Sequence, residues 1–393
     1  MKQVRVPASS RARRAALWGS AAGVLWACSS APNDVLLSHE TPSTGADAGS
    51  PPGADDQPTP LGPDATVDAA DAAPAFSAGA IKVCPSGCDH TLPSAAVAAA
   101  KDGAVIEILA GTYEDCFAIH ANQVTVRGVG GFAHLHTKMC DGKGIVVNYG
   151  QGTHLERLEL SGFANADYNG AAVRHDVVGK DLTLSGMFIH DGQLGVLASS
   201  TGDTVTVDSS LFRRVGVSRP DGEISVPLYV TGAQKLVVRR SRFLEGVAGA
   251  SMIKSRALST SIACSVIANL DGPDSYSIDL QLGNEFSLVN SVVEQSAATQ
   301  NKIVIAYGST SFTAATAGSF SIRGNTFIND ASGGTIINLF NGAPGTFDIS
   351  GNTFIGSGTP LNGGGQLGVN VVLATRPASL GAYPALPEPG ACP

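Results

Sequence analysis

Three polar residues with complementary chemistry, Tyr229, Lys254 and Asp279, stand at equivalent places in successive copies of a repeated pattern. Each precedes an apolar anchor residue by 13 or 14 positions. Each lies between apolar or small residues, so the alternation of strand side chains directs the polar residue outward and its neighbours inward. We expect the three side chains to form one outward-facing row, with Arg256 on the same side as Lys254.

This row contains the groups needed to abstract a proton next to a carboxylate. In β-elimination from a uronic acid polymer, a base removes the proton, a cation neutralises the carboxylate and an acid protonates the leaving oxygen. Lys254 is the candidate base, Arg256 the carboxylate-binding cation and Tyr229 the acid. Asp279 either orients Lys254 or holds a Ca²⁺ ion that binds the carboxylate. The alternative is a structural row, in which an exposed pair of Lys254 and Asp279 contributes less than about 1 kcal/mol.

Other residues extend the candidate substrate-binding surface. Arg174 shares the register of the row, and Tyr307 and Asn338 belong to the same strand in later copies. We therefore expect all three to contact the substrate, beside the row.

A basic stretch lies in an otherwise acidic chain. Residues 213–256 hold nine Lys or Arg against three Asp or Glu, whereas the net charge of the whole chain is −8. A basic stripe favours an anionic ligand, so we expect Arg239 and Arg240 to bind substrate. An acidic polysaccharide is the expected partner and nucleic acid is not expected. The alternative is a solvated outer face with exchangeable charges.

The element that positions these residues is a repeat in the second half of the chain. Each copy has an alternating apolar strand, a polar bend and an apolar anchor, and successive anchors are 24 to 35 residues apart. One such coil cannot bury its own apolar face, so the repeat predicts an all-β solenoid with coils stacked about 4.8 Å apart. A helix predicted over Pro93 to Lys101 would cap its N-terminal end. The anchors are Phe188, Phe212, Phe243, Ile267, Val292, Phe327 and Phe354.

Composition divides the 393 residues into four parts. Residues 1–28 have a basic start and a short apolar run, as in an export signal. Residues 29–77 are rich in Pro, Ala, Gly, Ser, Thr and Asp, which predicts a disordered tether. Residues 78–356 are predicted to form the solenoid, and residues 357–393 a tail packed on it.

The end of the signal, Leu25-Trp26-Ala27-Cys28, resembles a bacterial lipobox, although Trp26 stands where small residues are usual. The resemblance implies that Cys28 carries lipid and that this anchor is the only contact with a membrane. The protein would then belong to the cell envelope as an outer-membrane lipoprotein. The alternatives are an ordinary cleaved signal, with a secreted protein, or an uncleaved anchor.

The other six cysteines fit an oxidising compartment. Proximity in the sequence favours the pairs Cys84–Cys88 and Cys116–Cys140, and Cys264–Cys392 would then tie the tail to the body. The first pair does not predict a zinc site, because no second pair of ligands completes a set of four.

The segment from Leu92 to Gly128 resembles the start of pectate-lyase-like, right-handed parallel β-helix proteins. It has a helix, a strand and turn of the form G-x-x-I-x-I-x-x-G-x-Y, and a strand that ends in Arg-Gly. The similarity covers roughly residues 80–356 and implies a single right-handed parallel β-helix. It does not imply one activity, since this scaffold hosts lyases, hydrolases, epimerases, adhesins and spikes.

The segments Leu228 to Val230, Lys254 to Ala257 and Ser275 to Leu280 resemble uncharacterised bacterial β-helix lipoproteins. More distantly, the Lys-Ser strand is similar to that of the alginate lyase and chondroitinase B family, which implies that Lys254 is a base. That family uses an arginine as acid one coil later, where this chain has Asp279. The departure leaves lyase activity in doubt.

Other polar residues have structural alternatives. Asp271 and Asp274 form a candidate calcium loop, and the alternative is an ordinary turn, because Asp, Gly and Pro also make turns for local reasons. His134 and His136 are expected in a loop, and His175 in the core. Asparagines 325 and 352, at equivalent bends, predict a short structural stack.

These observations leave three functional hypotheses for a monomeric, exported protein. The first is a β-helix that binds an acidic polysaccharide and cleaves it by elimination. The second is a surface module that binds glycan or protein without catalysis, and the third is a structural spike. The sequence leaves open whether the protein is an enzyme and which polysaccharide it meets.

Overall fold

The computed structural model describes residues 76–392 apart from 178, 200–201, 221–223, 248, 311–317, 341 and 343–344. The predicted signal, with Cys28, and nearly all of the predicted tether lie outside the described residues. Within the described residues, no helix is long and apolar enough to cross a membrane.

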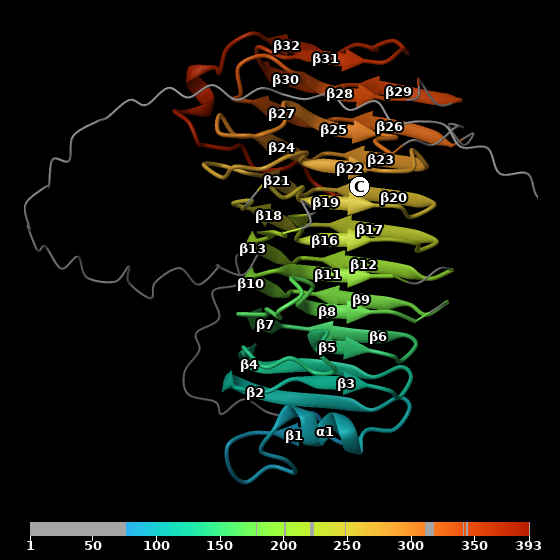
Figure 1. The fold of residues 1–393 in the computed structure, drawn as a ribbon, viewed down its shortest axis with the longest axis vertical. Helices are drawn as coiled ribbons and strands as arrows, with labels where there is room; N and C mark the ends of the chain where they lie inside the picture. Colours follow the sequence, from blue (N-terminus) through green and yellow to red (C-terminus); the bar gives the residue numbers. More distant parts are fainter. Residues whose placement is uncertain are drawn as a thin grey trace, which may run out of the picture. The chain divides into compact units, whose positions relative to one another are not determined.

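The described chain is an all-β parallel β-helix whose coils stack along one direction (Figure 1). Three strands recur in most coils, and the equivalent strands pair in parallel to form three walls. The first wall is a ten-stranded sheet in the described part of the chain. It contains β3 (Phe117–Ile119), β5 (Gly144–Asn148), β8 (Ala171–His175), β11 (Leu194–Ala198), β16 (Leu228–Val230), β19 (Ile253–Ser255), β22 (Ile278–Leu280), β25 (Ile303–Tyr307), β28 (Thr335–Leu339) and β31 (Thr359–Asn362).

The second and third walls join through the long strands β2 (Val105–Tyr113) and β4 (Thr125–His136). The second wall contains β6 (Thr153–Glu156), β9 (Leu182–Ser185), β12 (Thr204–Asp208), β17 (Lys235–Arg239), β20 (Ser259–Ala263), β23 (Glu285–Val289), β26 (Ser319–Arg323) and β29 (Thr346–Ser350). The third contains β7 (Leu158–Ser161), β10 (Phe188–Gly192), β13 (Leu211–Val215), β18 (Arg242–Leu244), β21 (Val266–Ala268), β24 (Val292–Gln295), β27 (Thr326–Asn329), β30 (Thr353–Gly356) and β32 (Val371–Leu373).

Inward side chains of the walls form one continuous apolar core. Phe212 stacks on Phe243 with ring centroids 4.5 Å apart, and Phe327 stacks on Phe354 at 5.2 Å. The predicted anchors therefore form an interior row, with two corrections. Ile189 and Val293 point inward at the places predicted for Phe188 and Val292, because the strand register differs by one residue in these coils.

The bend between the second and third walls repeats a hydrogen-bond pattern in successive coils. The residue at the bend has a positive φ, as at Arg240 (49°), Cys264 (50°) and Gly324 (67°). The next residue is Ser or Asn, and its side chain accepts a hydrogen bond from the equivalent backbone N–H of the preceding coil. The acceptors, in order, are Ser210, Ser241, Ser265, Ser291, Asn325, Asn352 and Asn370. The predicted asparagine stack is thus confirmed and belongs to a longer ladder.

Helix α1 (Pro93–Ala99) lies near β1 (Ile81–Val83) at the N-terminal end of the stack (Figure 1). It buries Pro93, Ala96 and Val97. Its role as a cap stays a prediction. A short antiparallel pair, β14 (Val217–Ser218) and β15 (Ile224–Ser225), lies in the connection from the third wall to the first.

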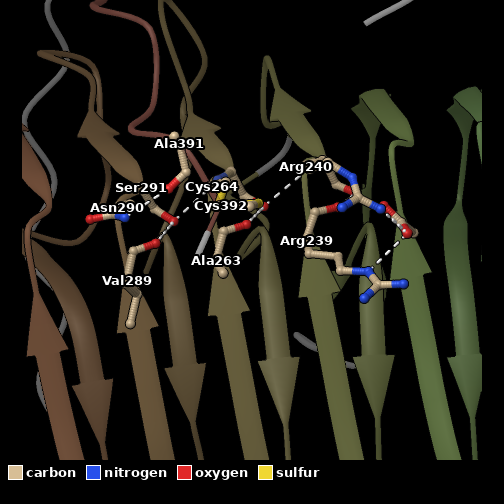
Figure 2. Close-up of a disulfide and its surroundings, with 12 residues drawn as sticks. Arg239, Arg240, Ala263, Cys264, Val289, Asn290, Ser291, Ala391 and Cys392 are labelled. Carbon is tan, nitrogen blue, oxygen red and sulfur yellow. Dashed lines mark hydrogen bonds and ion pairs between the residues drawn. A yellow bond between two sulfur atoms is a disulfide. The ribbon is translucent and has the colours of Figure 1, made fainter. Parts of the chain in front are cut away.

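The three predicted disulfides, Cys84–Cys88, Cys116–Cys140 and Cys264–Cys392, are all present. Strands β31 and β32 continue the stack beyond residue 356, and the 3₁₀ helix η1 (Ala378–Leu380) follows. The end of the chain then returns to earlier coils, where Cys392 meets Cys264 and Asn290 donates to the carbonyl of Ala391 at 2.8 Å (Figure 2).

The ladder at the bends predicts a large effect of Asn325→Ala. The Asn325 side chain accepts from the buried N–H of Ser291 and donates to the carbonyl of Leu288. Each buried group left without a partner costs about 1–3 kcal/mol, so we expect a marked fall in the midpoint of denaturant unfolding. Ser319→Ala, at an exposed position of β26, is the control. Equal midpoints for the two variants would contradict a stabilising role of the ladder.

Candidate functional site

The predicted row on the first wall is confirmed as a geometrical feature. Tyr229 pairs with Lys254, and Lys254 pairs with Asp279, in adjacent parallel strands. Their flanking residues, such as Leu228 and Ile253, are fully buried in the core. Strand alternation thus directs the three polar side chains to the outer side of the same wall.

Two other predicted members belong to this row, and one does not. Arg174 and Asn338 occupy the same register, whereas Ala306 stands where Tyr307 was expected. Tyr307 is 1% exposed and its hydroxyl donates to the carbonyl of Gly283 inside the coil. The prediction that Tyr307 contacts substrate is therefore wrong, because Ala306, one residue earlier on β25, takes the outward position and Tyr307 points into the core.

The centre of the row is a compact group of polar side chains. The ammonium of Lys254 lies 5.1 Å from the centroid of the Tyr229 ring. The Tyr229 hydroxyl donates to Oε1 of Gln281 at 3.2 Å, and Nε of Arg256 donates to the same oxygen at 2.6 Å. Gln281 therefore links the phenol to the guanidinium. Sequence reasoning missed Gln281, although it follows Asp279 by two residues and so shares its outward direction.

Asp279 lies in a less exposed position than an outward residue usually has. It is 4% exposed, and the hydroxyl of Ser309 donates to its carboxylate. Burial raises the pKa of Asp279, although the hydrogen bond from Ser309 and the charges of Lys254 and Arg256 act in the opposite direction. Among the described residues, Lys254 has no carboxylate oxygen within 4.0 Å, so the expected ion pair with Asp279 is absent.

The basic stretch does not form a single stripe, and this prediction is wrong. Arg239 and Arg240 lie at the end of the second wall, where both guanidinium groups contact Asp208 (Figure 2). Arg213 and Arg214, on the third wall, contact Glu245. The charges diverge because the stretch passes through all three walls within two coils. Arg239 and Arg240 therefore do not share a surface with the row.

The three aspartates predicted to bind Ca²⁺ are not brought together. Asp279 lies in the row, Asp271 is exposed in a turn, and Asp274 is fully buried three residues later. Beside Asp274 lie the buried Asn269, whose amide donates to the Asp274 carboxylate, and Glu294, which accepts from the backbone N–H of Asn269. The Ca²⁺ site therefore stays a proposal, and Asp274 has the side-chain oxygens of Asn269 and Glu294 nearby.

Burial raises the pKa values of Asp274 and Glu294 to about 8. One carboxylate oxygen of each is buried without a hydrogen-bond partner among the described residues, as is the amide oxygen of Asn269. Without a bound cation, both carboxyl groups are most stable in the protonated form, because charged carboxylates are costly to bury.

Comparison with known proteins finds similar solved structures of low sequence identity only. No protein-family model matches the chain, and no curated protein matches it. Similar solved structures include a pectin methylesterase from Aspergillus niger, with 12% identity over 66% of this chain and 87% of that chain and a TM-score of 0.44. A polygalacturonase from Erwinia carotovora ssp. carotovora has 9% identity, coverage of 79% and 96%, and a TM-score of 0.45. A PL6 family alginate lyase has 13% identity, coverage of 77% and 41%, and a TM-score of 0.40.

The buried carboxyl pair predicts that stability falls as the pH rises. The unfolded chain loses these protons near the ordinary values of 3.8 and 4.5, whereas the folded chain holds them to about 8. Between these limits, each pH unit therefore lowers the free energy of unfolding by up to about 1.4 kcal/mol for each of the two groups. Glu294→Gln should weaken this dependence, measured as urea midpoints at pH 5 and pH 8.

Glu285→Gln, at an exposed position of β23, is the matched control and should leave the pH dependence unchanged. An identical slope in the parent protein and Glu294→Gln would contradict the protonated pair. Added Ca²⁺ that flattened the slope only in the parent protein would support a cation at this place, because bound Ca²⁺ favours ionised carboxylates.

Proposed function

We propose that the outer face around Tyr229, Lys254, Arg256 and Asp279 binds an acidic polysaccharide. The observation that supports this most is the placement of two cations in adjacent positions of one wall, beside an aromatic ring. All three side chains are partly exposed. In the described part of the chain, the two Nη groups of Arg256 make no hydrogen bond, so they can bind a carboxylate in bidentate fashion. Sugar rings pack on aromatic faces, and Tyr229 supplies one.

The finer proposal is that this face cleaves its polysaccharide by β-elimination. Arg256 would neutralise the uronate carboxylate, which makes the neighbouring proton more acidic. Lys254 would remove that proton, and the Tyr229 hydroxyl would protonate the leaving oxygen. Asp279, whose pKa is raised by burial, would hold its proton at higher pH than an ordinary aspartate and is a second candidate acid. The neighbouring cations disfavour a Ca²⁺ ion at Asp279.

We also propose that the protein is exported and anchored through Cys28. The three disulfides support an oxidising compartment, since such bonds are rare in the cytosol. A lipid on Cys28 and a tether over residues 29–77 would hold the β-helix at a cell-envelope surface, where polysaccharides are accessible.

Binding should depend on the two cations of the row. We expect Lys254→Ala and Arg256→Ala each to weaken retention on alginate, pectate or sulfated glycan gels by about tenfold, because a charged hydrogen bond contributes about 1.5–3 kcal/mol. The loss should shrink at high salt. Lys235→Ala, an exposed cation on the second wall, is the matched control. Equal retention of all three variants would refute the proposed face.

Elimination has its own test. The unsaturated uronate product absorbs ultraviolet light, so its appearance with a panel of uronic acid polymers measures the reaction. We expect Lys254→Ala to abolish it. Binding without product on any polymer would leave the non-catalytic module as the function, and the absence of both binding and product would favour the structural spike.

A further inference from the structure

A second group of reactive side chains lies on the third wall, in three successive coils near the N-terminal end of the stack. His134 lies on β4, Glu159 on β7 and His190 on β10, and these strands are neighbours (Figure 1). Nδ1 of His134 is 3.6 Å from Oε1 of Glu159, and Nε2 of His190 is 3.1 Å from the same oxygen. One nitrogen of each histidine and one carboxylate oxygen all lie within 4.8 Å of one another.

The loop prediction for His134 was wrong, and the reason explains how the group forms. Strand β4 continues through the Gly-rich segment, where it crosses another part of the chain closely. A Cβ atom on Gly128 would lie 2.3 Å from the carbonyl oxygen of Arg157. Glycine therefore lets β4 reach the third wall, where His134 pairs with Glu159.

Each histidine has a partner on its far nitrogen. Nδ1 of His190 is 2.7 Å from the carboxylate of Asp191, and Nε2 of His134 is 2.7 Å from the hydroxyl of Ser161. Asp191 is in turn held by two hydrogen bonds from Arg214, at 2.7 and 3.0 Å. Such partners fix the tautomer and the ring orientation of histidines that bind metals.

The group is shielded but open to solvent. Side-chain exposures are 25% for His134, 16% for Glu159 and 14% for His190. The ring of Phe188 stacks on that of His190 with centroids 4.1 Å apart, which limits its rotation. An ion can therefore reach side chains that are already held in place, at a small cost in side-chain entropy.

We propose that His134, Glu159 and His190 bind one divalent transition-metal ion. Two imidazoles and one carboxylate form a borderline donor set that favours zinc-like ions over Ca²⁺ or Mg²⁺, which take oxygen ligands. Three protein ligands leave a coordination position for water or a substrate atom. Nothing in the proposed polysaccharide site requires this ion, so each proposal can be tested independently of the other.

An ion pair between His190 and Glu159 explains only part of this arrangement. It accounts for the contact of Nε2 of His190 with Oε1 of Glu159 at 3.1 Å. It does not account for His134, whose Nδ1 is directed at the same oxygen from 3.6 Å. An ion bound between the two rings would use one nitrogen of each histidine together with this oxygen.

The test is calorimetric titration of the folded full-length protein with Zn²⁺ alone, near pH 7.5. We expect one saturable site, which Glu159→Gln and His190→Ala each weaken at least tenfold. Asp191→Asn should weaken it about 10- to 100-fold by releasing the His190 ring. Co²⁺ in place of Zn²⁺ should give visible absorption bands of a four- or five-coordinate ion, and the same variants should abolish them.

His154→Ala is the matched control. His154 is also an outward histidine bonded to a serine hydroxyl, Ser185, at 3.0 Å, but it stands on the second wall among threonines. It should bind Zn²⁺ like the parent protein. Absence of saturable binding, or equal affinity of the parent protein and Glu159→Gln with native circular dichroism, would overturn the proposal. Loss of binding in His154→Ala alone would also overturn it.

Discussion

The fold depends on how the backbone polar groups of each bend are satisfied inside the stack. A parallel β-helix must reverse direction several times per coil, and each reversal directs N–H and carbonyl groups away from the sheet ladders. At the bend between the second and third walls, a Ser or Asn side chain accepts the N–H of the preceding coil, and serines also donate to a carbonyl two residues back. Each coil thereby supplies a hydrogen-bond acceptor to the bend of the preceding coil.

This constraint sets which residues can vary. The bends require a positive φ followed by a small polar residue, and the inward strand positions require apolar side chains of matching size. Outward strand positions carry neither requirement. Tyr229, Lys254 and Asp279 on the first wall, and His134, Glu159 and His190 on the third, all occupy such positions. The scaffold can therefore hold two separate chemical groups, because a residue outside the core does not disturb the stack.

Much of the fold, and part of the candidate site, can be predicted from the repeat. Strand alternation predicts which side chains point outward, and the spacing from the anchors predicts that Tyr229, Lys254 and Asp279 are neighbours. The spacing fails on β25, where Ala306 pairs with Asp279 and Tyr307 points into the core. The prediction of a basic stripe fails for another reason. Successive strands of one coil lie on different walls, so charges that are close in the sequence lie on different faces.

Long-range contacts are the part that the repeat does not predict. Gln281 joins Tyr229 and Arg256 through side-chain lengths that spacing alone does not describe. The histidine group depends on β4, whose glycines resemble a loop in sequence but continue a strand in space. Glycine has both uses because it lacks a Cβ, so composition alone does not distinguish a turn from a close crossing of two chain segments.

The neighbours of the row suggest how long a ligand it can hold. Leu197 precedes Tyr229 in the row and Ala306 follows Asp279, so the polar part spans three adjacent strands. With strands about 4.8 Å apart, that part is on the order of 10 Å long. Leu197 packs beside Tyr229 in a small apolar cluster, which extends the surface that a sugar ring can cover without adding charge. A polymer that lay across this face would contact Lys254 and Arg256 through a short segment only. Its affinity would therefore depend more on the charge of that segment than on the length of the polymer.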